Sequence, residues 1–130
     1  MNNPLPTDAS QINISVQTNY IAAQSEPESE RFVFSYTITI TNNGCESVKL
    51  LARRWQITDA NGETNIVEGK GVIGQTPEIA ASASYTYSSG SMFSTPVGTM
   101  EGHYQMVSSA GELLQVPIPI FRLAIPNILN

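Results

Sequence analysis

The chain has 130 residues, with six basic and eleven acidic side chains, a formal net charge of −5 and a single cysteine. This length predicts one domain, which can bury enough surface to fold without metals or disulfides. The acidic balance and the scattered basic residues disfavour binding to nucleic acid or to a membrane surface. Cys45 has no partner for a disulfide, and the N-terminus lacks the basic and apolar regions of a signal peptide. We therefore expect a cytoplasmic protein.

Residues 1–10 contain two prolines and show no periodicity, so they are predicted to form a disordered N-terminal tail. A single domain is expected over residues 11–130. Apolar and polar residues alternate at 12–17 and, most clearly, at Phe32–Thr41. Alternation with period two indicates strands that bury one face.

The segment 48–58 is predicted to be a strand in which the apolar residues change parity. Leu50 belongs to one parity and Trp55 to the other. A β-bulge near Arg53 and Arg54 would let both apolar halves face the core and would point both arginines outward.

The rest of the chain continues the pattern of short strands and turns. Strands are predicted around Glu63–Glu68, Ser84–Ser88, Gly102–Ser108 and Leu113–Leu123, with turns at Asp59–Gly62, Ser88–Gly90, Pro96–Gly98 and Ala110–Gly111. Pro117 and Pro119 place the last strand at a sheet edge or beside a bulge. The pattern predicts an all-β fold, an antiparallel β-sandwich of immunoglobulin-like or fibronectin type III-like kind with about seven to eight strands.

Several motifs together resemble the ApaG family, over nearly all of the chain from about Ile12 to Pro126. The matching stretches are Leu51–Trp55, Gly69–Gly74 with Pro77, Tyr87–Gly90, Gly98–Met106 and Val116–Phe121. The sequence departs from the family pattern at Arg54, where the family often has histidine, and at Ala81–Ala83, where it often has Pro-Gly-Glu. The resemblance implies a fibronectin type III-like sandwich.

The same resemblance implies a binding role. Bacterial members of the family carry a name tied to cobalt resistance and magnesium efflux, which for this chain implies at most an indirect link. In eukaryotic relatives the domain is attached to F-box proteins and to a DNA-polymerase-delta-interacting protein, which suggests a module for protein–protein interaction. A shared family does not by itself fix a function.

Gly69, Gly71 and Gly74 have the spacing of a dinucleotide-binding fingerprint. That fingerprint works only in a parallel strand–helix–strand unit with an acidic residue about 20 positions further on, and neither condition is met here. Lys70 is not followed by the Ser or Thr of a P-loop. The favoured interpretation is a bulged loop between strands, and the alternative is a backbone nest around Lys70 that binds phosphate or a nucleotide.

Two groups of carboxylates are weak candidates for a divalent cation. Glu101 and His103 stand two residues apart on a predicted strand and therefore share a face, but a third ligand must come from elsewhere. Glu26, Glu28 and Glu30 could hold a hard cation such as Mg²⁺ or Co²⁺. A solvated linker is the favoured interpretation, because a loop that is not preorganised rarely binds a cation selectively. No nucleophile motif is present, so we expect no enzymatic activity and no cofactor.

Arg53, Arg54 and Trp55 form the candidate partner surface, because arginines beside aromatic side chains are frequent in protein-binding hot spots. The sequence therefore predicts a non-enzymatic module whose partner is another protein. A phosphate-type anion and a divalent cation are the alternatives. An exposed strand edge would also allow a homodimer formed by sheet extension.

Overall fold

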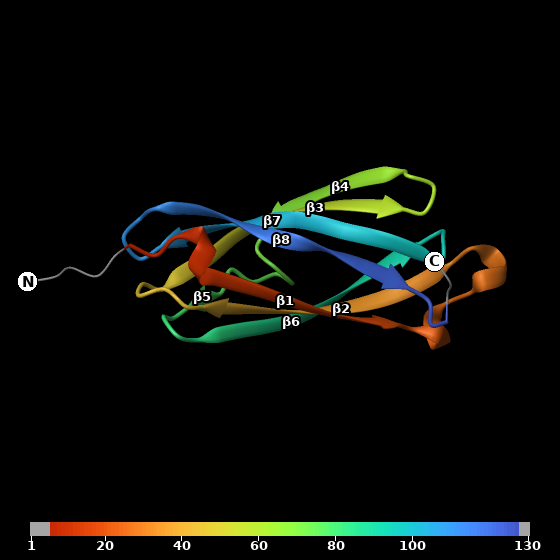
Figure 1. The fold of residues 1–130 in the computed structure, drawn as a ribbon, viewed down its shortest axis with the longest axis horizontal. Helices are drawn as coiled ribbons and strands as arrows, with labels where there is room; N and C mark the ends of the chain where they lie inside the picture. The colour runs from red at the N-terminus through yellow and green to blue at the C-terminus, as the bar shows by residue number, and fades with distance from the viewer. Residues whose placement is uncertain (1–5, 128–130) are drawn as a thin grey trace, which may run out of the picture.

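Two antiparallel sheets make up the fold in the computed structural model, which describes residues 6–127 (Figure 1). The first sheet has the order β1-β2-β6, and the second has the order β4-β3-β7-β8, with β5 paired to β3. The strands are β1 Ile12–Tyr20, β2 Phe32–Asn42, β3 Val48–Asp59, β4 Thr64–Lys70, β5 Glu78–Ile79, β6 Ser84–Phe93, β7 Val97–Ser108 and β8 Leu113–Ala124. The predicted β-sandwich is confirmed, with eight strands.

The regular elements outside the sheets are short. Three 3-10 turns occupy Ala9–Gln11, Ala22–Gln24 and Pro27–Ser29. Within residues 6–127 no helix has the length and apolar character needed to cross a membrane.

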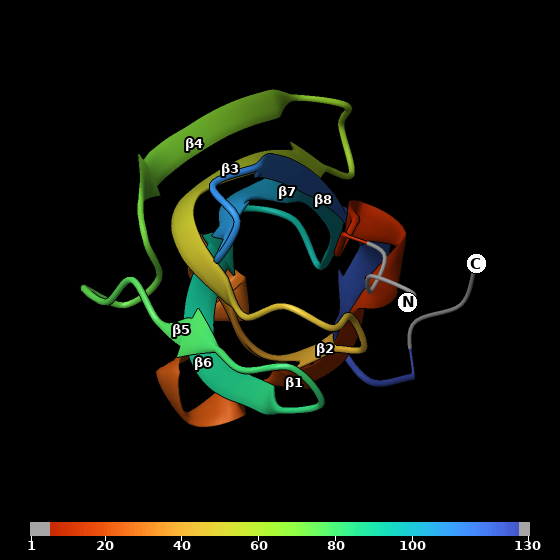
Figure 2. The ribbon, with the colours of Figure 1, turned by 90° about the vertical axis from the view of Figure 1, so that its left-hand side faces the viewer.

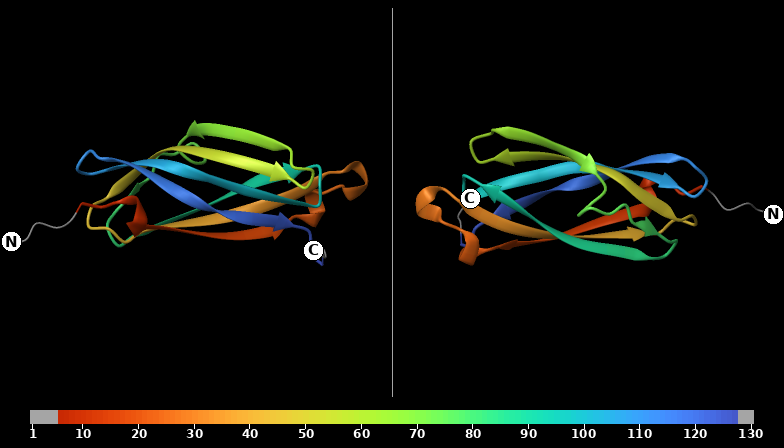
Figure 3. Two further views of the ribbon diagram at one scale, coloured as in Figure 1. Left: turned by 45° about the horizontal axis from the view of Figure 1, so that its top comes forward. Right: turned by 180° about the vertical axis from the view of Figure 1, so that it is seen from behind.

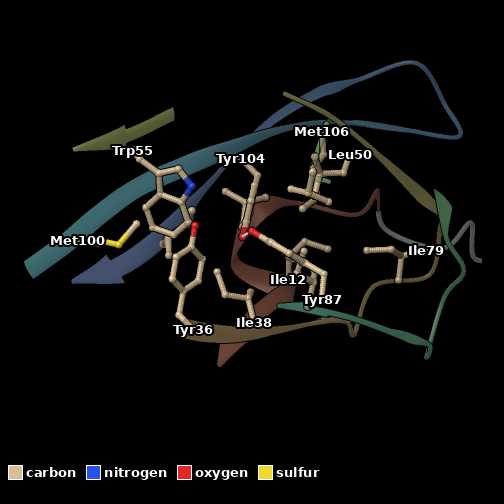
Figure 4. Packing of buried hydrophobic residues seen from close by; sticks show 14 of the residues in the cluster. Ile12, Tyr36, Ile38, Leu50, Trp55, Ile79, Tyr87, Met100, Tyr104 and Met106 are labelled. Atoms are coloured by element: carbon tan, nitrogen blue, oxygen red, sulfur yellow. Dashed lines mark hydrogen bonds between the residues drawn. The ribbon is translucent and has the colours of Figure 1, made fainter. Parts of the chain in front are cut away.

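The inner face of β2 provides the centre of the core. Every second residue of β2 is buried, as the period-two pattern predicts. Ile38 and Ile40 are fully inaccessible to solvent and belong to the same hydrophobic cluster as Leu50 and Met106 of the opposite sheet. Figure 4 shows part of this cluster. On the outer face the threonines of β2 pair with hydroxyls of β6, for example Thr37 Oγ1 with Ser88 Oγ at 2.7 Å.

The predicted turn at Ser88–Gly90 is wrong. These residues lie inside β6 and pair with β2, Ser88 opposite Thr37 and Gly90 opposite Ser35. Small hydroxyl residues resemble a turn in the sequence, but here Ser88 faces solvent and meets Thr37 of β2, whereas Ser89 is half-buried and lies opposite Tyr36.

The bulge in β3 exists but lies earlier than predicted. The pairing of β3 with β7 shifts between Leu50 and Ala52, so Leu51 is the extra residue. This shift changes the parity before the arginines, and Trp55 then faces the core like Leu50. Arg53 and Arg54 continue the regular strand, so they cannot both point outward.

Pro117 and Pro119 lie in β8, which is an edge strand as predicted. The pairing of β7 with β8 is also irregular beside them, between Met100 and Gly102. A strand that lacks two N–H donors is tolerated here because only one of its sides pairs with a neighbour.

Part of the predicted N-terminal tail is folded. Thr7 is buried, and its hydroxyl accepts a hydrogen bond from the backbone N–H of Glu46 at 2.9 Å. Asp8 caps the 3-10 turn that precedes β1. The domain therefore begins before Gln11, and residues 1–5 of the predicted tail lie outside the described residues.

The two lateral sides of the sandwich differ. On one side β1 and β8 pack beside each other (Figure 3). On the other side, β4 lies beyond β3 as the outer strand of the second sheet and does not pack on β6 in this way (Figure 2). The chain between β4 and β5 crosses this open side, so two strand edges, β4 and β6, border it.

Asn42 joins the β2–β3 loop to β5 and should contribute strongly to stability. Its buried amide donates to the carbonyls of Glu46 and Ile79, and its Oδ1 accepts from the N–H of Gly44. Asn42→Ala leaves these groups without partners and should lower the free energy of unfolding by about 2–3 kcal/mol. Urea denaturation measures this, with Asn43→Ala on the exposed neighbour as control; equal losses in both variants would contradict the assignment.

Candidate functional site

The predicted partner surface of Arg53, Arg54 and Trp55 is divided among three environments. Trp55 is only 3% exposed and belongs to the core. Arg54 points to the outer face of the sheet, where Nε lies 3.7 Å from a carboxylate oxygen of Glu68. Arg53 shares the inner face with Trp55. The three residues therefore do not form one surface, because neighbouring residues of a strand point to opposite faces.

Arg53 turns over the neighbouring strand β4. It is paired with Gly69 of β4, and a Cβ built on Gly69 would lie 2.7 Å from Arg53 Nη1 and 2.9 Å from Cζ. The guanidinium therefore occupies the space that a side chain at position 69 would take. Nη1 donates to the carbonyls of Gly71 at 2.9 Å and of Lys70 at 3.2 Å, which ties the end of β4 to β3.

A hollow of about 230 Å³ lies next to this guanidinium, and we name it the Arg53 pocket. It is lined by Tyr36, Arg53, Trp55, Val72, Ile73, Tyr87, Ser88 and Ser89. These residues come from both sheets and from the segment that crosses the open side. Arg53 supplies the only formal charge of the lining, and within residues 6–127 it has no carboxylate within salt-bridge distance.

Buried tyrosines lie beneath the Arg53 pocket. The hydroxyls of Tyr87 and Tyr104 form a hydrogen bond between the sheets, and Tyr36 packs edge-on against Trp55 (Figure 4). Burial raises the pKa of the Tyr36 phenol, although Ser89 and Arg53 lower it in part. Burial likewise raises the pKa values of Tyr87 and Tyr104. All three phenols are therefore neutral at physiological pH, and each keeps an O–H donor.

The open side continues past the pocket along β3 and β6. A second hollow of about 550 Å³ lies there, between the β3–β4 hairpin and the end of β6. Its lining includes Ile57, Asn65, Met92 and Phe93. We call the Arg53 pocket and this second hollow together the β3–β6 groove. Val67 of β4 is paired with Trp55 and therefore faces the groove, and it is 40% exposed.

The rim of the Arg53 pocket carries an unusual backbone conformation. Val72 and Gln75 exchange two backbone hydrogen bonds around a two-residue turn, in which Ile73 has φ 47° and Gly74 has φ 71°. Positive φ at both central positions belongs to a type I′ turn, which favours Asn-Gly. A β-branched residue there is strained, and Ile73 is also 58% exposed.

The three glycines of the fingerprint-like motif have structural roles. Gly69 leaves space for the Arg53 side chain, and Gly71 and Gly74 adopt the positive φ angles that the loop requires. A Cβ on Gly71 would lie 2.1 Å from the carbonyl oxygen of Gln75. The backbone N–H groups of Gly71, Val72 and Gln75 donate to carbonyls within the chain, so these three amides are not available to a phosphate. β4 is antiparallel to β3, and β5 follows the loop. This geometry is that of a loop between strands, and it differs from a nucleotide-binding turn.

Glu101 and His103 line a different hollow, on the outer face of the second sheet. Arg54, Gln56 and Pro117 border it as well. Arg54 is paired directly with His103, which places a fixed positive charge beside the only histidine. Among the described residues no three His, Cys, Asp or Glu side chains gather in the manner of a metal site.

Sequence reasoning missed the residues of β6 and of the turn that complete the Arg53 pocket. Ser88 and Ser89 were assigned to a turn, which concealed their position beside Tyr87. Ile73 lies within the Gly69–Gly74 motif, and the sequence reasoning assigned a role only to the glycines and Lys70 of that motif. A signal was present in Ile73-Gly74, where a β-branched residue occupies the place that Asn normally takes in a tight hairpin turn.

Comparisons with known proteins give a consistent result over almost the whole chain. A model of the ApaG domain matches residues 22–108. Protein ApaG of Proteus mirabilis is 51% identical over 122 residues, which cover 94% of this chain and 98% of that protein. Protein ApaG of Vibrio cholerae is 54% identical over 119 residues, covering 92% and 94%.

A solved structure shares both the sequence and the fold. The X-ray structure of a structural-genomics target is 50% identical in sequence and superposes with a TM-score of 0.89. The match covers 93% of this chain and 92% of that one.

The buried tyrosines predict a loss of stability at alkaline pH. The unfolded chain releases a phenolic proton near the ordinary pKa of 10.0, whereas folded Tyr104 keeps its proton to higher pH. Stability is therefore complete below pH 10 and falls as the pH rises above it, by about 1.4 kcal/mol per pH unit for each such group. Urea titrations across this range should give a smaller slope for Tyr104→Phe than for the unmodified chain, and equal slopes would contradict the prediction.

Proposed function

This chain belongs to the ApaG domain family, and we propose that it is a non-enzymatic protein-binding module whose partner occupies the β3–β6 groove. The observation that carries the proposal is the open side of the sandwich. There, two strand edges, an exposed apolar rim and a guanidinium without a carboxylate partner among the described residues come together within one groove.

The apolar part of the groove has the character of an interaction surface. Ile73 and Val67 are large, exposed and close to buried aromatic residues of the pocket. Hot spots of protein interfaces are enriched in Arg, Tyr and Trp, and the lining of the Arg53 pocket combines Arg53 with Tyr36 and Tyr87. Ile73 also keeps a strained conformation that an asparagine would relieve, and such strain is often retained for function.

The chemistry of the Arg53 pocket supports binding rather than catalysis. Its polar groups are neutral phenols, whose pKa values burial raises further, two serine hydroxyls and a guanidinium. None of these is a general base at physiological pH, so nothing in the pocket lining is suited to activate a nucleophile. The indirect link to cobalt and magnesium handling would then run through the bound partner.

Photocrosslinking in the cells that produce the protein tests the proposal. A benzoylphenylalanine in place of Ile73 should yield a discrete crosslinked protein, identified by mass spectrometry, because Ile73 lies on the rim of the groove. The matched control replaces Leu113, which is similarly exposed at 65% but begins β8, outside the groove. The same products from both positions, or no discrete product from Ile73, would refute the proposal.

A further inference from the structure

The free edge of β4 provides backbone groups for an additional strand. Among the described strands β4 pairs only with β3, and six of its seven residues are exposed. A partner segment in extended conformation can pair with such an edge, in which case main-chain hydrogen bonds give affinity and alternate side chains give specificity. The question is therefore which side chain the groove would select.

Arg53 reaches toward this edge across Gly69. Its guanidinium lies over Gly69, one strand away from its own Cα, because no side chain occupies that space. Neighbouring strands lie about 4.8 Å apart, and directly opposed residues share a face. A residue paired with Gly69 from an added strand would thus point into the groove, beside the guanidinium of Arg53.

We propose that β4 receives an extended segment of the partner protein as an added antiparallel strand, with a carboxylate side chain opposite Gly69 that is bound by Arg53. This inference rests on the proposed function and names the chemistry of the partner. Nη1 of Arg53 makes the hydrogen bonds to the carbonyls of Lys70 and Gly71, and the guanidinium has further donors on Nε and Nη2.

Charge and size favour the carboxylate. The Arg53 pocket contains one positive charge and no acidic residue, whereas the acidic residues Asp59 and Glu63 line the second hollow of the groove. A single guanidinium matches a monoanion in a forked geometry. The volume of about 230 Å³ is below the roughly 300–1,000 Å³ of small-molecule sites, so it suits one side chain better than a nucleotide.

The residues of β4 that precede Gly69 also restrict which side chains the added strand can carry. In an antiparallel addition, the residue two positions after the carboxylate lies opposite Val67 and faces the same groove, so an apolar side chain is expected there. The residue between them lies opposite Glu68, on the outer face, and should not be acidic. The expected motif is therefore Glu or Asp, a non-acidic residue, and then an apolar residue.

NMR titration of the full ¹⁵N-labelled chain with a synthetic peptide tests this motif. The probe is acetyl-Thr-Val-Thr-Glu-Thr-Val-Thr-amide, and its matched control replaces Glu with Gln. The Glu peptide should shift the amides of residues 66–70 and of Ser88 and Ser89, and should bind about fivefold more tightly, the factor that a partly exposed ion pair supplies. A fully N-methylated Glu peptide should not bind, because it cannot pair with a strand edge.

Variants of Arg53 and Arg54 test which of the two arginines causes the preference for the Glu peptide over the Gln peptide. Arg53→Gln should abolish the preference for Glu over Gln, whereas Arg54→Gln, on the outer face, should keep it. If Arg53→Gln does not fold, Arg53→Lys serves instead; it keeps the charge, loses the forked donors and should reduce the preference.

Several results would overturn the inference. In the peptide titrations, these results are equal affinity for the Glu and Gln peptides, a preference for Glu that persists without Arg53, or tighter binding of a phosphoserine peptide. Amide shifts confined to the face of Arg54 and His103 would also contradict the inference. In sedimentation, a dimer formed through β4 would do the same, because the edge would then be occupied by a second copy of the chain. Crosslinking from Ile73 to a discrete protein without a preference for Glu would refute the carboxylate site alone. A preference for Glu without any crosslinked partner would refute the proposed function and leave the site.

Discussion

The contact between Arg53 and Gly69 holds the open side of the sandwich in its shape. The guanidinium fills the place of the missing side chain at position 69 and bonds the carbonyls of Lys70 and Gly71, so the end of β4 and the start of the following loop are fixed to β3. One arginine thus combines two roles. It positions the segment that crosses the groove, and it supplies the positive charge within the groove.

The contact between Arg53 and Gly69 lies on the one lateral side of the sandwich where the sheet edges do not cover each other. Where β1 and β8 meet, the sheet edges cover each other, and Pro117 and Pro119 further discourage pairing of β8 with another chain. Where β4 departs from the sandwich, its edge stays open and Val67 remains exposed. Proteins normally protect such an edge, so an open one beside a charged pocket is consistent with use by a partner.

Much of the fold could be predicted from the sequence, because the period-two pattern of β2 and the proline pair of β8 depend on burial and hydrogen bonding within single strands. The positions of the bulge and of Ser88–Gly90 were predicted incorrectly, since pairing with a neighbouring strand decides both. The residues of the Arg53 pocket could not be predicted from the sequence either, because contacts between distant segments bring them together. Arg53 meets Gly69 across a hairpin, and Ile73 and Ser89 approach each other only when the two sheets pack together.

The ¹⁵N resonance of Arg53 Nε tests the central claim most directly. Arg53→Gln assigns this signal by its disappearance. In Gly69→Ala the new Cβ would lie 2.7 Å from Nη1, so the guanidinium must move and the Nε signal should shift, together with the amides of Gly71 and Val72. Gly90→Ala, where a Cβ has ordinary space at 3.4 Å, should leave the signal in place. An unchanged Nε signal in Gly69→Ala would contradict the claim that Arg53 is held over Gly69.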